Sequence, residues 1–332
     1  MYFCKLKKNS MNVSFLLKQY FQGIEDITID VFDAHSLNDV YQQVLATLTS
    51  HFEIEISVLQ ALSYCFYEIL DNVHIHSGKP LGTAITHFDA QNEKLRVLVA
   101  DDGMGIRQSL AENEKYKNIT EAEALRMCLQ DSVTDGKGMG FGLYATSRLV
   151  KNIGFNFVLH SGHHKLIRKE GQTEVIDNGF WQGTIIYMEL STSKDFDPND
   201  VVDYRTDADE QYNEAFIATD GLDSLWGEGS GTVLFRFSDY GKDFGTRDMG
   251  RKLRERIRPL LEKNVVELDF TGVNVVSNSF ADECFAKLLL EMPLENLRAH
   301  TIFRGLSPMA ERSILVALQR RLANQSGMAI VQ

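Results

Sequence analysis

Two runs of alternating strand and helix patterns, separated by an acidic stretch, most constrain what this chain can fold into. In the N-terminal half, strand-like segments such as "DITIDVFD" and "KLRVLVADDG" alternate with helical apolar periodicity. The alternation restarts at "TVLFRFS" and continues to "SPMAERSILVALQRRLAN". Such alternation indicates α/β folds in which helices pack on a sheet. A chain of 332 residues is long enough for two domains of this kind.

The stretch between the two runs has a different composition. The segment "KDFDPNDVVDYRTDADEQYNEAFIATDGLDSLWGEGSG" is rich in Asp, Glu and Gly, and Arg205 is nearly its only base. This composition is typical of a solvated linker. We therefore predict an N-terminal extension with a strand and a helix (1–45), a first α/β domain (46–193), an acidic linker (194–230) and a smaller second α/β domain (231–332).

Charge and cysteine content exclude several classes of protein. With a formal net charge of −12, we do not expect a nucleic-acid partner, because affinity for phosphate comes from clustered Lys and Arg. No apolar run reaches the roughly 18–20 residues of a membrane span. The four cysteines form no C-x-x-C pair, so a zinc site is not expected. We expect reduced, buried thiols in a cytoplasmic protein without membrane segments.

A helix predicted over the stretch "SYCFYEILDNVHIHSGK" carries three polar residues at intervals of four. Glu68, Asn72 and His76 follow one another along one side of this helix. An amide oxygen can ligate Mg²⁺, and a carboxylate can deprotonate a nucleophile. Many helices contain E-x-x-x-N, and a histidine in the last helical turn is favoured by the helix dipole alone. The spacing therefore needs support from elsewhere in the chain.

A carboxylate and alternating glycines follow a predicted buried strand. In "VLVADDGMGI" the strand ends at Asp101, and Gly103 and Gly105 come next. Glycines let the backbone turn sharply and approach a ligand closely. A carboxylate at this position can accept a hydrogen bond from an exocyclic amine. The alternative is a simple hairpin turn, since Asp-Gly is a strong turn signal.

A third element is the glycine-rich segment "DGKGMGFGLYAT". Glycines alternate from Gly136 to Gly142, and a helix is predicted to begin at about Leu143. A loop of this kind before a helix N-terminus can bind phosphates through backbone N–H groups and the helix dipole. It matches neither the dinucleotide fingerprint nor the P-loop.

The order of these elements, closed by Gly183 and Thr184 in a later strand, resembles the GHKL ATPases: gyrase B subunits, heat-shock chaperone ATPases, mismatch-repair ATPases and histidine kinases. The resemblance covers about 57–190. It implies a two-layer α/β sandwich of the GHKL (Bergerat) type that binds ATP and Mg²⁺. Asn72 would then hold Mg²⁺, Asp101 would bind the adenine amine with Thr184 supporting it through water, and Gly103 and Gly105 would pass close to the base.

The same resemblance assigns the triphosphate to the glycine-rich loop and to the helix that follows it. The implied contacts come from Lys137, Gly138, Met139, Gly140, Gly142 and Leu143. Glu68 would be the catalytic base. Two-component histidine kinases often lack such a glutamate and need an upstream phosphoacceptor helix, which residues 1–50 do not show. The E-x-x-x-N-x-x-x-H spacing is instead similar to that of the anti-sigma-factor serine kinases, and partly to that of the hydrolysing members.

The C-terminal stretch "VVELDFTGVNVVSNSFADECFAKLLL" resembles STAS-like domains, relatives of the anti-anti-sigma factors, over about 231–324. In phosphorylatable relatives a serine at the helix start follows an aspartate. Here Asn278 occupies that place between Ser277 and Ser279, and no aspartate precedes it. Ser279 is the candidate phosphoacceptor; the alternative for both serines is helix N-capping.

Together these features predict a nucleotide-gated switch. The leading hypothesis is an ATP-binding regulatory protein with slow, Mg²⁺-dependent hydrolysis that acts on a protein partner through its STAS-like domain. One alternative is an anti-sigma-type serine/threonine kinase, and another is a non-catalytic module that binds nucleotide for stability. The sequence leaves hydrolysis and phosphotransfer both open. A homodimer is expected because small homodimers are common among GHKL relatives.

Overall fold

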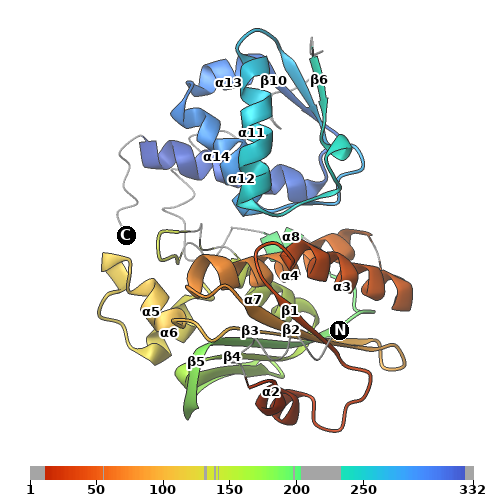
Figure 1. Cartoon of the computed structure of the whole chain (residues 1–332), viewed down its shortest axis with the longest axis vertical. Helices are drawn as coiled ribbons and strands as arrows, with labels where there is room; N and C mark the ends of the chain where they lie inside the picture. Colours follow the sequence, from red (N-terminus) through yellow and green to blue (C-terminus); the bar gives the residue numbers. More distant parts are fainter. Residues whose placement is uncertain are drawn as a thin grey trace. The chain divides into compact units, whose positions relative to one another are not determined.

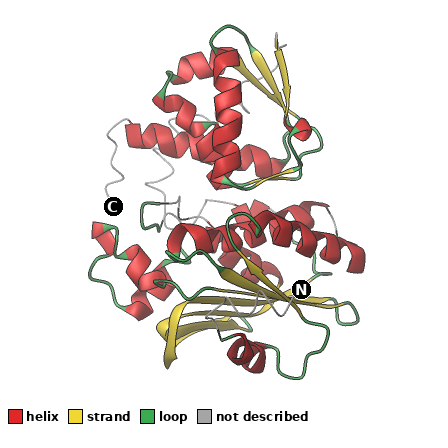
Figure 2. Ribbon diagram, viewed as in Figure 1, coloured by secondary structure: helices red, strands yellow, loops and turns green. Residues whose placement is uncertain are grey.

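The computed structural model describes residues 12–54, 56–130, 133–137, 140, 142–196, 199–202 and 233–325. The chain divides into two compact units, Met1–Val201 and Val202–Gln332, and both combine helices with sheets (Figures 1 and 2). The predicted linker falls largely on residues 203–232, which lie outside the described part of the chain. The predicted domain boundaries therefore stay predictions. No described helix is long and apolar enough to cross a membrane.

The first unit is built on a five-stranded sheet with the order β1-β2-β3-β5-β4, in which all pairings are antiparallel. The strands are β1 (Thr28–Phe32), β2 (Gly82–Asp89), β3 (Lys94–Ala100), β4 (Gly154–Lys169) and β5 (Gln172–Ser191). The helices are α2 (Val13–Tyr20), α3 (Leu37–His51), α4 (Ile56–His76), α5 (Ile106–Leu110), α6 (Glu121–Met127), α7 (Gly142–Ile153) and α8 (Asn199–Val202), with a 3-10 turn, η1, at Glu114–Tyr116. Helices α3, α4 and α7 lie over one face of the sheet (Figure 1).

The side chains of the central strand β3 point alternately into two apolar layers, one on each face of the sheet. Leu95 and Val97 line an apolar pocket together with residues of α3, α4 and α7. Leu98 and Ala100 point the other way, into a cluster that contains Leu16 and other residues of the N-terminal segment. Because successive side chains of a strand point to opposite faces, a strand buried on both faces needs cover on both sides.

The cover on the second face is α2, which packs on the side of the sheet opposite α3, α4 and α7. Leu16 is fully buried, and Phe15 stacks on Trp181 with ring centroids 5.6 Å apart. The side chain of Asn12 caps the helix by accepting a hydrogen bond from the Phe15 N–H at 3.0 Å. The apolar stripe of α2 packs on the sheet.

Strands β4 and β5 form one long hairpin. β4 contains two strand-like runs of the sequence, "NFVLHSG" and most of "HKLIRKEG", and has register irregularities near Gly162. β5 begins at Gln172, well before its strand-like run "GTIIYMEL". Its early residues are mostly exposed and polar, so no burial alternation marks them in the sequence.

The second unit contains a three-stranded parallel sheet, β10-β8-β6, and a two-stranded parallel pair, β7-β9. The strands are β6 (Val233–Arg236), β7 (Asp243–Phe244), β8 (Val266–Asp269), β9 (Val275–Val276) and β10 (Thr301–Arg304). The helices are α11 (Arg247–Leu261), α12 (Asn278–Cys284), α13 (Leu294–His300) and α14 (Pro308–Gln325), with 3-10 turns η3 (Phe237–Asp239) and η4 (Ala286–Leu290). The alternation that the sequence showed from "TVLFRFS" to "SPMAERSILVALQRRLAN" corresponds to the elements from β6 to α14.

Stacked and edge-on phenylalanine rings fill the core of the second unit. Phe237 and Phe270 stack with centroids 4.1 Å apart, and Phe237 meets Phe244 edge-on at 5.5 Å. Each aromatic side chain buries a large apolar area, and such pairs add stability beyond that area.

Three cysteines, Cys65, Cys128 and Cys284, are free and buried within the described residues, as predicted, and Cys4 lies outside them.

The packing of α2 leads to a stability prediction. Leu16→Ala removes a fully buried side chain from the second face of the sheet and is expected to cost about 2–4 kcal/mol of unfolding free energy. Gln19→Ala, at an exposed position of the same helix, is the control and should change it by less than about 0.5 kcal/mol. Urea denaturation of the full chain measures both. Equal effects of the two variants would contradict the assignment of α2 to the core.

Candidate functional site

The row of polar residues on α4, Glu68, Asn72 and His76, faces the beginning of α7. Glu68 is buried, and Asn72 and His76 are half-buried. A Cβ atom at Gly142, the first residue of α7, would lie 2.8 Å from Glu68 Oε2 and 3.6 Å from Asn72 Nδ2. The Glu68 Cβ atom would be 3.0 Å from such a Cβ, so glycine permits this close approach of the α7 N-terminus to the carboxylate and the amide. The helical period predicted the alignment of Glu68 and Asn72, and the fold adds Gly142 to it.

Asp101 is a buried carboxylate at the end of β3. Its backbone N–H donates to the Thr184 carbonyl at 2.9 Å, and its Oδ1 accepts from the Gly103 N–H at 2.8 Å. Burial raises the pKa of Asp101 to about 6, and the nearby Asp102 adds to this, while the backbone N–H groups of Gly103 and Thr184 oppose it. A buried carboxylate with few donors binds a proton, or a ligand that donates hydrogen bonds.

Glycines around Asp101 permit contact of backbone with backbone. A Cβ at Gly103 would lie 2.2 Å from the Ser77 carbonyl oxygen, at the end of α4. A Cβ at Gly183, where φ is +92°, would lie 2.3 Å from the Asp101 carbonyl oxygen. A Cβ at Gly105, where φ is +77°, would lie 2.6 Å from the Ser161 hydroxyl oxygen. These glycines bring the end of α4, the loop after β3 and the strand β5 together.

Two side chains that the sequence did not single out hold this loop in place. Trp181 donates its indole N–H to the Asp101 carbonyl at 3.1 Å, and the Gln182 amide donates to the Gly103 carbonyl. They immediately precede Gly183 and Thr184 in β5. An aromatic and an amide residue before a Gly-Thr pair carry no signal of this role in the sequence.

The glycine-rich segment is described at some of its positions. Gly140, at φ +69°, packs on the backbone of Val133, and Leu143 is half-buried in the first turn of α7. Lys137 is exposed, and its ammonium group lies 2.6 Å from Glu112 Oε2. The predicted phosphate contacts of Gly138 and Met139 lie outside the described residues.

A second buried carboxylate, Asp135, lies at the start of this segment. Its Oδ2 accepts from the Ser109 hydroxyl at 2.7 Å and is 2.7 Å from His76 Nδ1. Its Oδ1 accepts from the Lys137 N–H at 2.9 Å. Burial alone would raise the pKa of Asp135, but the hydrogen bond and charge of His76, with the Ser109 and Lys137 hydrogen bonds, hold it well below its usual range. No pattern in the sequence singled out Asp135 and Ser109, and the helix dipole offered an alternative reason for His76.

The donor set can be tested against the predicted Mg²⁺. Among the described residues, no group of three His, Cys, Asp or Glu side chains could hold a metal ion. Mg²⁺ in nucleotide sites uses one or two protein oxygens together with phosphate oxygens and water. Asn72, beside Glu68 and the N-terminus of α7, suits that type of binding, in which the nucleotide supplies most of the ligands.

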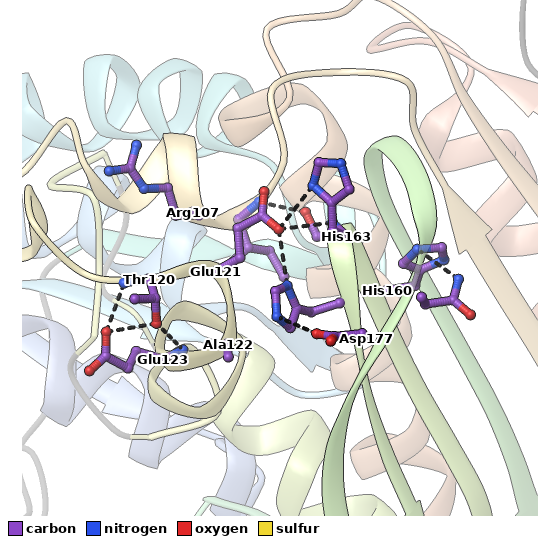
Figure 3. Close-up of polar contacts among 12 residues, drawn as sticks. Arg107, Thr120, Glu121, Ala122, Glu123, His160, His163 and Asp177 are labelled. Carbon is purple, nitrogen blue, oxygen red and sulfur yellow. Dashed lines mark hydrogen bonds and ion pairs between the residues drawn. The ribbon is translucent and has the colours of Figure 1, made fainter.

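A separate polar cluster joins α6 to the β4–β5 hairpin (Figure 3). Glu121 Oε2 accepts from the His163 N–H at 2.9 Å and lies 3.0 Å from His164 Nδ1. His164 Nε2 lies 3.1 Å from Asp177 Oδ1. Thr120 caps α6 in a reciprocal capping box with Glu123. This cluster fixes the position of α6 on the hairpin and contains none of the predicted site residues.

In the second unit, the turn that carries the candidate phosphoacceptor is buried. Ser277 is the N-cap of α12: its hydroxyl oxygen accepts from the Phe280 N–H at 3.0 Å and donates to the Gly245 carbonyl at 2.7 Å. Capping therefore accounts for Ser277. Asn278 and Ser279 are also buried, at 2% and 8% exposure. The hydroxyl of Ser279 is thus poorly accessible to a kinase in this structure.

Comparison with known proteins identifies part of the second unit. Residues 249–311, from α11 to the first turn of α14, match the family described as STAS-like domain of unknown function (DUF4325). No curated protein matches the chain. The match confirms the predicted STAS-like character of the C-terminal part, and the chain is an α/β protein that contains a STAS-like domain.

Proposed function

We propose that the first unit is a GHKL-type ATP-binding unit with slow, Mg²⁺-dependent hydrolysis, and that nucleotide occupancy controls a protein partner of the STAS-like unit. The observation that carries this proposal is the meeting of three distant segments. Asn72 of α4 lies beside Gly142 of α7, and the end of the same helix packs on Gly103 of the loop after Asp101. The GHKL resemblance requires these segments to surround one ligand.

The Asp101 end of the site suits the adenine base. Its carboxylate would accept a hydrogen bond from the exocyclic amine, and Thr184, which bonds Asp101 through its backbone, would support the ring through water. Gly103 and Gly183 allow the loop after β3 to pack directly on Ser77 and on β5, which holds Asp101 in its buried position. A pKa of about 6 leaves Asp101 largely ionised at pH 7.5, in the form that accepts the bond.

The Asn72 end of the site suits the triphosphate. The first turn of α7 presents backbone N–H groups and the positive end of the helix dipole at Gly142. Asn72 would supply an oxygen to Mg²⁺, whose chemistry is to neutralise phosphate charge. Lys137 would contact a phosphate only after leaving Glu112. Glu68, against Gly142, would orient a water and accept its proton.

The kinase alternative shares this site and differs in the acceptor. Burial of Ser279 disfavours phosphorylation within the chain, so a kinase of the anti-sigma type would act on a separate STAS partner. Incubation with γ-labelled ATP separates the hypotheses: free phosphate indicates hydrolysis, and label on an added partner indicates transfer. Binding of ATP without either product would favour the non-catalytic module. The same purified protein would be used to identify the proposed partner and to test for the expected homodimer.

Asp101→Asn tests the adenine contact. The amide cannot act as a charged acceptor, so ATP affinity should fall by about 1–3 kcal/mol, or roughly 5–150-fold. Isothermal titration calorimetry at pH 7.5 measures this, and Glu114→Gln, an exposed carboxylate on η1, is the control. In the wild type, affinity should also decrease as the pH falls through about 6, because Asp101 becomes protonated. Unchanged ATP affinity of Asp101→Asn would reject the site.

The same variant should be more stable than the wild type without nucleotide. The pKa of Asp101 is about 6 in the folded chain and near 3.8 when unfolded, so the ionised group destabilises the fold above pH 6. The stability it contributes is full below pH 4 and is lost as the pH rises through 6, by up to about 3 kcal/mol. Asp101→Asn should therefore gain stability at pH 8 and little at pH 4. Thermal denaturation at both values checks the sign.

Glu68→Gln tests the assignment of the base. The substitution keeps the shape of the side chain but cannot accept a proton, so the hydrolysis rate should fall by about 10²–10⁴ while ATP still binds. Steady-state phosphate release and calorimetry measure the two effects separately. If hydrolysis persists at the wild-type rate, Glu68 is not the base. Loss of binding together with hydrolysis would instead indicate a structural role beside Gly142.

A further inference from the structure

We propose that Asp135 is a positioning residue for phosphate binding: it holds the start of the glycine-rich segment against His76 of α4 and Ser109 of α5. This inference rests on the proposed ATP site and adds to it a residue that does not touch the nucleotide. Ser109 lies outside the motifs that carried the GHKL resemblance; His76 ends the E-x-x-x-N-x-x-x-H spacing and Asp135 begins the glycine-rich segment, but the resemblance assigned no contact between them.

Three segments meet at this one carboxylate. The Asp135 side chain is 1% exposed, and its two oxygens are within 2.7–2.9 Å of His76 Nδ1, the Ser109 hydroxyl and the Lys137 N–H. An ionised carboxylate is costly to bury unless hydrogen bonds compensate it. The buried position is therefore stable only while α4, α5 and the segment at 133–137 keep this arrangement.

The anchored residues determine where the phosphate-binding glycine lies. A Cβ at Gly140 would be 2.4 Å from the Val133 carbonyl oxygen, so Gly140 packs directly on the segment that Asp135 holds. The Thr134 carbonyl accepts from the Asn113 amide at 3.1 Å, which adds a second attachment to the residues after α5. Movement of 133–137 would displace Gly140 with it.

His76 connects this anchor to the rest of the site. It lies one turn beyond Asn72 on α4, and the next residue, Ser77, packs on Gly103. Its imidazole bonds Asp135 and also acts electrostatically on Asp101. Helix α4 therefore fixes three groups relative to one another: the Asp101 carboxylate proposed to bind adenine, the Asn72 amide proposed to bind Mg²⁺, and the start of the glycine-rich segment. A displaced anchor should impair binding of phosphates and spare the base.

The test compares ATP with adenosine, which lacks phosphates, by calorimetry in the presence of Mg²⁺. Asp135→Asn retains the shape of the side chain but puts an amide where Oδ2 accepts from Ser109. ATP affinity should fall about tenfold or more, and adenosine affinity should change less than about twofold. Glu114→Gln, an exposed carboxylate on η1, is the matched control and should leave both affinities within about twofold.

Two further variants separate positioning from general destabilisation. His76→Gln keeps a donor for Asp135 and should retain ATP affinity within about threefold, whereas His76→Leu should lose it as Asp135→Asn does. Ser109→Ala removes a single donor and gives a milder change if Asp135→Asn does not fold. In ligand-free Asp135→Asn, peptides covering 133–137 should exchange amide hydrogens faster than in the wild type.

The outcomes are distinct for the two proposals. Equal losses of ATP and adenosine affinity in Asp135→Asn, or no loss of either, would overturn the positioning role and leave the ATP site intact. A wild-type protein that binds neither ligand would overturn the ATP site and the positioning role with it. Both proposals are supported if the wild type binds ATP, if Asp135→Asn selectively loses ATP affinity, and if His76→Gln keeps the ATP affinity that His76→Leu loses.

Discussion

The candidate site depends on the direct packing of backbone on backbone around Asp101. The end of α4 contacts the loop after β3 at Gly103, and that loop contacts β5 at Gly183, without space for a Cβ atom at either glycine. This packing excludes water from the Asp101 carboxylate and so raises its pKa. It also fixes α4 relative to the sheet, and Glu68, Asn72 and His76 are carried on that helix. A larger side chain at either glycine would displace α4 and these three residues with it.

Local periodicity predicted the parts of the site that lie on single elements. The spacing of four placed Glu68 and Asn72 on one side of α4, and the end of an apolar strand placed Asp101 at the edge of the sheet. The contacts between elements were not predictable, since hydrogen-bond partners such as Asp135 and Ser109 are set by tertiary packing. Trp181 and Gln182 act through their side chains on backbone carbonyls, which leaves no pattern in a sequence.

The fold shows the same division. Most helices and strands of both units follow from apolar periodicity, and the STAS-like resemblance is supported by the family match over 249–311. The missed elements are short or polar: α2 has eight residues, and the beginning of β5 has little buried surface. In the second unit, the phenylalanine core buries the turn at Ser277–Ser279. This favours a domain that responds through its surface over one that is phosphorylated at this turn.

Two buried carboxylates of the first unit have opposite pKa shifts, and the difference separates their roles. Asp135 receives hydrogen bonds from His76, Ser109 and the Lys137 backbone, so its charge is compensated within the protein. Asp101 receives backbone N–H groups and the electrostatic influence of His76, but burial and a neighbouring acid outweigh them, so its charge is undercompensated. A carboxylate satisfied by the protein stabilises one arrangement of the chain. A carboxylate that is buried and undercompensated destabilises the free protein, and an external donor relieves that cost. A ligand that carries an amine at Asp101 and phosphates at the segment held by Asp135 would use both properties.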